Sequence, residues 1–129
     1  MTASDTKTIL VVDDDDGVRS LVRAVLRRHG HNVETARDGA EALKKIREEA
    51  YSLILLDLMM PKIDGLEVMR KIEDEGITSH ALIVVMTAAD DSLIAQLDRR
   101  RVHGVIRKPF DIEELAEIVT ESISVRDRI

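Results

Sequence analysis

The sequence contains no cysteine and no tryptophan, and its only aromatic residues are Tyr51 and Phe110. Without cysteine, disulfide bonds, thiolate catalysis and zinc–thiolate sites are excluded. Two aromatic residues are too few for a platform on which nucleic-acid bases stack. No apolar run approaches the roughly 18 residues that span a bilayer, and residues 1–7 lack the basic and apolar regions of a signal peptide. We therefore expect a cytoplasmic protein with no direct contact to membrane or nucleic acid.

The composition is that of a globular domain. The chain has 129 residues, of which 44% are hydrophobic and 34% charged, enough for one domain with a buried core. Its net charge of −6 disfavours anionic partners such as nucleic acid. We expect a single domain over residues 1–129, with a core from about residue 7 to residue 124. The polar tail over residues 124–129 is expected to fray.

Short apolar runs alternate with amphipathic stretches along the chain. We predict strands over residues 8–12, 32–36, 52–57, 81–86 and 104–107. Each is followed by apolar residues at helical spacing, and Val18, Leu21, Val22, Val25 and Leu26 are expected to form the inner face of the first helix. The fourth helix is expected to start at a cap on Asp90 or Asp91 and to end at Asp98–Arg101, whose arginines suit the negative end of the helix dipole. Strict strand–helix alternation predicts the α/β class, with a doubly wound parallel sheet of five strands and five helices.

Two helix starts share one pattern. Asp38-Gly-Ala-Glu41 and Asp64-Gly-Leu-Glu67 each resemble a capping box in which aspartate replaces serine or threonine. Gly30 and Gly76 stand where the first and third helices should end, because glycine readily adopts the backbone conformation that terminates a helix.

The most informative stretch is the run of residues 53–61, LILLDLMMP. Four consecutive aliphatic residues fit a strand buried on both faces, and Asp57 follows them directly. A carboxylate at the end of a buried strand is costly unless that end opens into a site. Ligands bind beyond the carboxyl ends of strands in open α/β sheets. Asp57 is therefore the first candidate for a functional residue, the alternative being an aspartate that caps a turn.

Other polar residues end the neighbouring strands. Asp13 and Asp14 follow the first strand, Thr87 the fourth and Lys108 the fifth, so all should meet Asp57 at one edge of the sheet. Clustered carboxylates repel one another unless a cation joins them, and hard oxygen ligands favour Mg²⁺. Lys108 suits a phosphoryl oxygen, Thr87 can donate a hydrogen bond to another, and Asp57 is the natural nucleophile, forming an acyl phosphate.

Each of these residues also has an ordinary structural interpretation. The run Asp13–Asp16 is typical of a solvated acidic turn that caps a helix, Thr87 of a turn residue, and Lys108-Pro109 of a strand end before a rigid turn. Their shared position, directly after successive strands, favours a site.

Four motifs in order carry a family resemblance. They are ILVVDDD over residues 9–15, LDLMMPKIDG over 56–65, VMTA over 85–88 and KPF over 108–110. The chain resembles the receiver domains of two-component response regulators from about Lys7 to Ser124. The resemblance implies a flavodoxin-like fold with strand order 2-1-3-4-5. It also implies a cis peptide bond between Lys108 and Pro109.

The resemblance further implies a function. Asp57 would accept a phosphoryl group from a sensor histidine kinase or a histidine phosphotransfer protein. Mg²⁺, with Mn²⁺ as a substitute, would be bound by Asp14, Asp57 and the main-chain carbonyl of Met59, with Asp13 acting through water. Thr87 and Lys108 would contact the phosphoryl oxygens. Such a protein is a signalling switch rather than an enzyme, although it assists its own phosphotransfer and slow autodephosphorylation.

The expected output is a change in the surface of the fourth helix, fifth strand and fifth helix. That surface would control an unidentified downstream partner, and the protein would be a monomer or a weak dimer. Two features depart from the family pattern. Val105 stands where receivers usually place an aromatic residue that swings with the threonine, and Arg101–Gly104 replaces the usual Gly-Ala-Asp-Asp.

Two other classes share parts of the pattern. A hydrolase of the haloacid-dehalogenase kind would need a second aspartate two positions after Asp57, where Met59 stands, and a cap domain for which 129 residues leave no room. A flavodoxin-like binding module would need a phosphate-binding loop after the first strand. The four acids Asp13–Asp16 would repel phosphate there unless a metal intervened.

Overall fold

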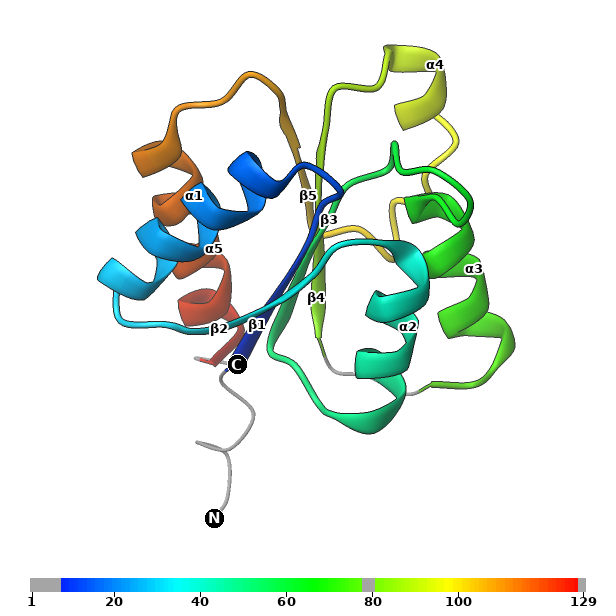
Figure 1. The fold of residues 1–129 in the computed structure, drawn as a ribbon, viewed down its shortest axis with the longest axis horizontal. Coiled ribbons are helices and arrows are strands. Elements are labelled where there is room, and N and C mark those ends of the chain that lie inside the picture. The colour runs from blue at the N-terminus through cyan, green and yellow to red at the C-terminus, as the bar shows by residue number, and fades with distance from the viewer. Residues whose placement is uncertain (1–7, 78–80, 128–129) are drawn as a thin grey trace.

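A single parallel sheet forms the centre of the protein. The computed structural model describes residues 8–77 and 81–127. The strands lie in the order β2-β1-β3-β4-β5 (Figure 1). Their bounds are β1 (Thr8–Val12), β2 (Asn32–Ala36), β3 (Leu53–Leu56), β4 (Leu82–Thr87) and β5 (Gly104–Arg107). The helices are α1 (Asp16–Arg28), α2 (Gly39–Glu48), α3 (Gly65–Asp74), α4 (Asp91–Ile94) and α5 (Ile112–Asp127). The predicted fold class and strand order are confirmed.

Two helical layers cover the sheet. α1 and α5 lie on one face, and α2, α3 and α4 lie on the other (Figure 1). The four residues of β3 are all buried, with exposures of at most 1%. Leu53 and Leu55 pack with the α1–α5 layer, and Ile54 and Leu56 pack with the α2–α3 layer. The uninterrupted apolar run therefore reflects a strand that contacts helices on both sides.

Aspartate side chains cap the N-termini of the helices. Asp38 and Asp64 accept hydrogen bonds from the backbone N–H groups of Glu41 and Glu67, at 2.7 and 2.9 Å. Asp90, rather than Asp91, caps α4 by accepting from the Leu93 N–H. Gly30 and Gly76 follow α1 and α3 with φ angles of 91° and 64°, the left-handed conformation expected beyond a helix end.

The fourth helix is shorter than the sequence predicts. It ends at Ile94 instead of Arg101, so the three arginines do not complement its dipole. The Asp98 carboxylate accepts a hydrogen bond from the Arg100 backbone N–H at 3.0 Å, and the Asp98 carbonyl accepts from the Arg101 N–H at 2.9 Å. Aspartate thereby offers the backbone a local turn that competes with helical hydrogen bonding.

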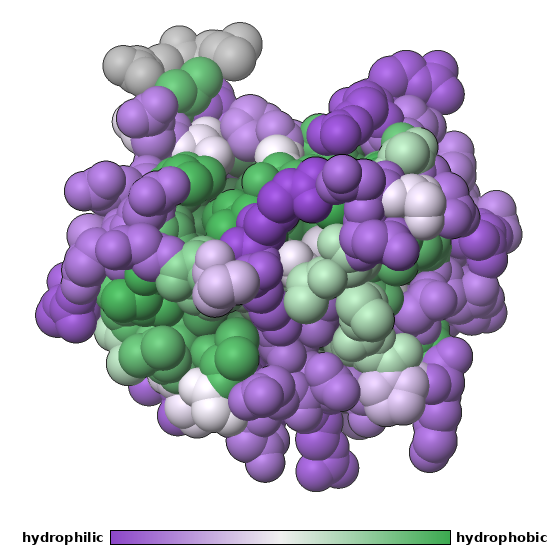
Figure 2. Space-filling view, turned by 90° about the horizontal axis from the view of Figure 1, so that it is seen from above, coloured by the Kyte–Doolittle hydropathy of each residue, from purple (hydrophilic) through white to green (hydrophobic). Residues whose placement is uncertain are grey.

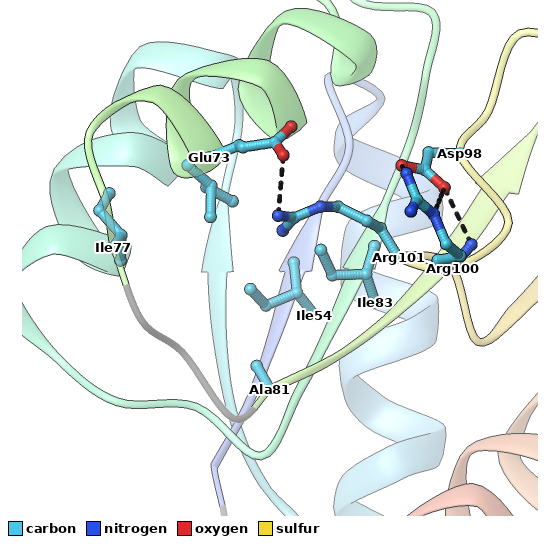
Figure 3. A pocket seen from close by; sticks show the side chains of 9 residues that line it. Ile54, Glu73, Ile77, Ala81, Ile83, Asp98, Arg100 and Arg101 are labelled. Carbon is cyan, nitrogen blue, oxygen red and sulfur yellow. Dashed lines mark hydrogen bonds and ion pairs between the residues drawn. The ribbon is translucent and has the colours of Figure 1, made fainter.

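The turn that replaces the end of this helix borders a groove of about 460 Å³ (Figure 3). Ile54 and Ile83 contribute apolar side chains from the sheet, and Arg101 reaches Glu73 of α3 at 3.0 Å. The groove is lined from β3, β4, α3 and the 98–101 turn, and its lining does not include Asp57.

Two smaller expectations are also corrected. Residues 124–127, expected to fray, belong to α5, and the Arg126 guanidinium donates to the Ser52 carbonyl at 2.9 Å. Leu21, whose spacing placed it on the inner face of α1, is 53% exposed. Among the residues described, none of the helices combines the length and the apolar character required to cross a membrane.

Candidate functional site

The sheet register brings two acidic segments together. Val12 at the end of β1 pairs with Leu56 at the end of β3, so Asp13 and Asp57 leave adjacent strands at the same level. The Asp57 backbone N–H continues the ladder by donating to the Val12 carbonyl at 3.0 Å. Asp13 is fully buried and Asp57 is 3% exposed. The prediction that these carboxylates meet at one edge of the sheet is confirmed.

A third carboxylate completes the group. Asp14 is exposed, and carboxylate oxygens of Asp13, Asp14 and Asp57 all lie within 4.8 Å of one another. Figure 2 views the protein from this edge, where hydrophilic side chains surround smaller hydrophobic areas. Carboxylate oxygens at this spacing are hard donors that suit Mg²⁺. The side chains therefore fit a magnesium ion.

Lys108 supplies the positive charge of the site. Its ammonium lies 2.7 Å from Asp13 Oδ2 and 3.3 Å from Asp57 Oδ2. It is brought there from β5, since its backbone N–H donates to the Thr87 carbonyl at 2.9 Å. The peptide bond to Pro109 is cis, as the family resemblance implied.

Thr87 and Met59 stand at the edge of this group. Thr87 is the last residue of β4 and is fully buried, and its hydroxyl accepts a hydrogen bond from the Ala89 N–H at 3.0 Å. The Met59 backbone N–H donates to Asp57 Oδ1 at 3.0 Å, while the Met59 side chain is exposed. Thr87 is thus tied to Lys108 through the backbone, and Met59 lies directly beside Asp57.

The run of four acids divides into separate roles. Asp15 caps α1 by accepting from the Val18 N–H at 2.9 Å, and Asp16 pairs with Arg19. The Arg19 guanidinium also donates to the Asp13 carbonyl at 2.8 Å. Arg19 thus braces the segment that carries Asp13 and Asp14. Sequence reasoning missed this residue, and its spacing of three from Asp16 was the only available signal.

Burial and charge set the protonation of the two central groups. Burial is the largest influence and raises the pKa of Asp57, with the Asp13 charge adding to it, while the Met59 N–H and Lys108 oppose the shift. Burial lowers the pKa of Lys108, but its hydrogen bond to Asp13 and the charges of both carboxylates outweigh burial, so this pKa is raised. The lysine is therefore an ammonium at neutral pH, facing an acid whose ionisation is costly.

Comparison with known proteins assigns the family. The model of the response regulator receiver domain family matches residues 9–120. The chain belongs to this family. The receiver domain is 43% identical over 109 residues to the response regulators MprA of Mycobacterium ulcerans and Mycobacterium avium, a match covering 83% of this chain and 46% of theirs. It thus spans about half the length of these curated relatives.

Solved structures agree with this assignment. A CheY-like receiver domain protein of Methanospirillum hungatei superposes with a TM-score of 0.84 at 31% identity, over 95% of this chain and 98% of that one. The response regulator TrrA of Thermotoga maritima, solved with Mg²⁺ and BeF, gives 0.77 at 36% identity, over 90% and 98% of the two chains. Receiver domains generally bind Mg²⁺ at an acidic pocket, and Asp13, Asp14 and Asp57 form such a cluster here.

The raised pKa of Asp57 predicts a pH-dependent stability difference. An acid whose folded-state pKa is raised costs folding free energy once it ionises, and the cost grows as pH rises from its ordinary value near 4 through its folded-state value. Asp57→Asn should therefore be more stable than the native protein at pH 7 without divalent cations. Below about pH 4 the two should converge.

Urea unfolding across this pH range with a chelator present measures the difference. Glu121→Gln, which changes an exposed carboxylate in the middle of α5, is the matched control and should not reproduce the difference. Equal or lower stability of Asp57→Asn at pH 7 would contradict the argument.

Proposed function

We propose that Asp57 accepts a phosphoryl group from a phosphohistidine of a sensor histidine kinase or a histidine phosphotransfer protein. The observation that carries this proposal is the convergence of Asp57, Asp13, Asp14 and the Lys108 ammonium at one edge of the sheet. A bond forms between an Asp57 carboxylate oxygen and phosphorus as the bond from phosphorus to the histidine nitrogen breaks. The protein is then the phosphorylated product, not a catalyst in turnover.

Asp14, Asp57 and the Met59 carbonyl would hold Mg²⁺, or Mn²⁺ in its place, with Asp13 acting through water. The bound cation supplies charge neutralisation at the entering phosphoryl oxygens. Three carboxylates and one ammonium leave a net charge of −2 in the group, which one divalent cation balances. The residues beside Asp57 can therefore admit an anionic phosphoryl group only with a cation present.

Two side chains would respond to the phosphoryl group itself. The Lys108 ammonium now contacts Asp13 and Asp57 and would move onto a phosphoryl oxygen. The Thr87 hydroxyl, which accepts from the Ala89 N–H, has its own proton to donate to a second phosphoryl oxygen. Hydrolysis of the acyl phosphate at this site would return the protein slowly to its starting state, which is the autodephosphorylation we include in the proposal.

The output surface is proposed to be α4, β5 and α5. Phosphorylation would change this surface and thereby the affinity for an unidentified downstream protein, with the receiver acting as a monomer or a weak dimer. Val105 of β5 is half-buried and packs against the core cluster that contains Ile94 and Leu97. A valine has no ring to swing between buried and exposed positions, so the change should be modest.

The phosphorylation proposal predicts a single labile modification. Incubation with Mg²⁺ and acetyl phosphate should add one acid-labile phosphoryl group, because the Asp57 carboxylate lies beside both the Lys108 ammonium and the proposed Mg²⁺ site. Intact-mass measurement detects it. Asp57→Asn should abolish the addition, whereas Asp111→Asn, at the start of α5, should not. Undiminished labelling of Asp57→Asn would show that another residue is the acceptor.

The metal proposal predicts a contrast between two acids of one run. Asp14→Ala should weaken Mg²⁺ binding by at least about tenfold, the range seen for changes at metal sites, because Asp14 shares the carboxylate cluster. Asp16→Ala should change the affinity little, since Asp16 pairs with Arg19 instead. Titration of Mg²⁺ against amide shifts gives both affinities, and equal losses would mean that the acids act only as a diffuse field.

The output proposal predicts that Val105 limits the response. Native phosphorylation should shift partner affinity by about 1–2 kcal/mol, the low end of allosteric coupling. Val105→Tyr should enlarge the amide-shift changes around Leu93, Leu97 and β5, because the ring can move with Thr87. Amide shifts of both proteins, before and after phosphorylation, measure the effect. A strong native response that Val105→Tyr leaves unchanged would show that the missing aromatic residue is not limiting.

A further inference from the structure

Gly39 and Gly65 occupy the same position in two helices. Each follows the aspartate cap of its helix, Asp38 or Asp64. The cap itself is made by the aspartate side chain, and the left-handed glycines of the described chain are Gly30 and Gly76. Neither capping nor backbone conformation therefore requires glycine at these two positions. Alanine would be the better helix former there.

Both glycines are instead pressed against the segment that carries Asp57. A Cβ atom on Gly65 would lie 2.5 Å from the Asp57 carbonyl oxygen and 2.8 Å from Leu58 Cα. A Cβ atom on Gly39 would lie 2.5 Å from the Ile63 carbonyl oxygen and 2.8 Å from Ile63 Cβ. These distances are below the 3.0 Å that real Cβ atoms keep from their neighbours, so either substitution forces backbone to move.

The two contacts bracket one stretch of chain, residues 57–64, here called the acceptor loop. Gly65 fixes its beginning, and Gly39, which comes from α2, fixes its end at Ile63. Between them Leu58 and Met60 are buried, and Lys62 adopts a left-handed conformation with φ of 68°. The Gly65 N–H also donates to the Leu58 carbonyl at 3.0 Å. The loop is thus held by backbone contacts at both ends and by side chains in its middle.

We infer that Gly39 and Gly65 are positioning residues for the acceptor loop, setting where Asp57 and the Met59 main chain lie relative to Asp13 and Asp14. The expected effect on phosphorylation and Mg²⁺ binding rests on the proposed function. The glycine contacts themselves do not depend on it. Neither glycine has a side chain that could touch a metal or phosphoryl group. They act only by letting the loop approach α2 and α3 more closely than a residue with Cβ would allow.

The test compares Gly39→Ala with Gly104→Ala. A Cβ on Gly104 meets no atom within 4 Å, so the same chemical change there should leave the site as it is. Gly39→Ala should slow phosphorylation by acetyl phosphate about tenfold to a hundredfold, because small displacements of reacting groups are that costly. It should also weaken Mg²⁺ binding. The phosphorylation rate and the Mg²⁺ affinity of Gly104→Ala should stay within about twofold of the native values. Such a change is small beside the loss expected from a misplaced reacting group.

Three further variants separate positioning from general loss of stability. Val119→Ala removes buried side-chain volume from the α5 face of the core and should lower the unfolding temperature without slowing phosphorylation. Gly65→Ala gives a second measurement should Gly39→Ala not fold. In an Ile63→Gly background, which removes the Ile63 Cβ and Cγ2 atoms facing Gly39, the effect of Gly39→Ala should shrink in part, since the two changes share these side-chain contacts. It should not vanish, because the Ile63 carbonyl oxygen 2.5 Å from the new Cβ atom remains.

The outcomes are distinct. If folded Gly39→Ala and Gly65→Ala phosphorylate and bind Mg²⁺ as the native protein does, or lose no more activity than Val119→Ala at equal stability, the positioning inference is overturned. If the native protein itself takes no phosphoryl group at Asp57, the proposed function fails instead. In that case the amide shifts of Met59 and Ile63 decide the inference: displacement in Gly39→Ala but not in Gly104→Ala supports it, and unchanged shifts overturn it.

Discussion

The arrangement of the site depends on the ion pairs that the Lys108 ammonium makes with Asp13 and Asp57. Asp13 is fully buried and Asp57 is nearly so. Two ionised carboxylates in these positions repel each other with little water to screen the repulsion. Lys108 lies between them at 2.7 and 3.3 Å and offsets part of that repulsion. Asp14 adds a third carboxylate, and among the described residues the ion pairs of this group involve no lysine besides Lys108. The group therefore carries an excess of negative charge that favours a further cation.

Sheet register brings these side chains to one edge of the sheet. The pairing of Val12 with Leu56 delivers Asp13 and Asp57 side by side, and the pairing of Thr87 with Arg107 places Lys108 one residue beyond. In parallel strands every carboxyl end faces the same way. Asp13, Asp57 and Lys108, which are distant in sequence, thus meet without a long loop. A shift of one register position would turn each of these side chains to the opposite face.

Much of this was predictable because the signals are periodic or positional. Apolar runs specify the strands, and polar residues after each run specify the site. The sequence did not predict where α4 ends, because the apolar spacing of Leu93 and Leu97 continues past Ile94. In the structure the Gln96 and Leu97 N–H groups donate to carbonyls three residues back rather than four, and Asp98 then forms a local turn. Nor did it predict the Gly39–Ile63 contact. A close approach of two backbones leaves no pattern in one sequence, since glycine has many other uses.

Short α4 lies where the site meets the proposed output surface, and two connections reach it. Thr87 accepts from the Ala89 N–H, and Ala89 precedes the Asp90 cap of this helix. Lys108 follows Arg107, whose guanidinium lies 2.7 Å from the Asp91 carboxylate at the first residue of α4. A movement of Thr87 or Lys108 would therefore displace the start of α4 through adjoining residues. A helix of one turn has few internal hydrogen bonds to resist such a displacement. The absence of a ring at Val105 would remove one form of the proposed readout and leave these two connections in place.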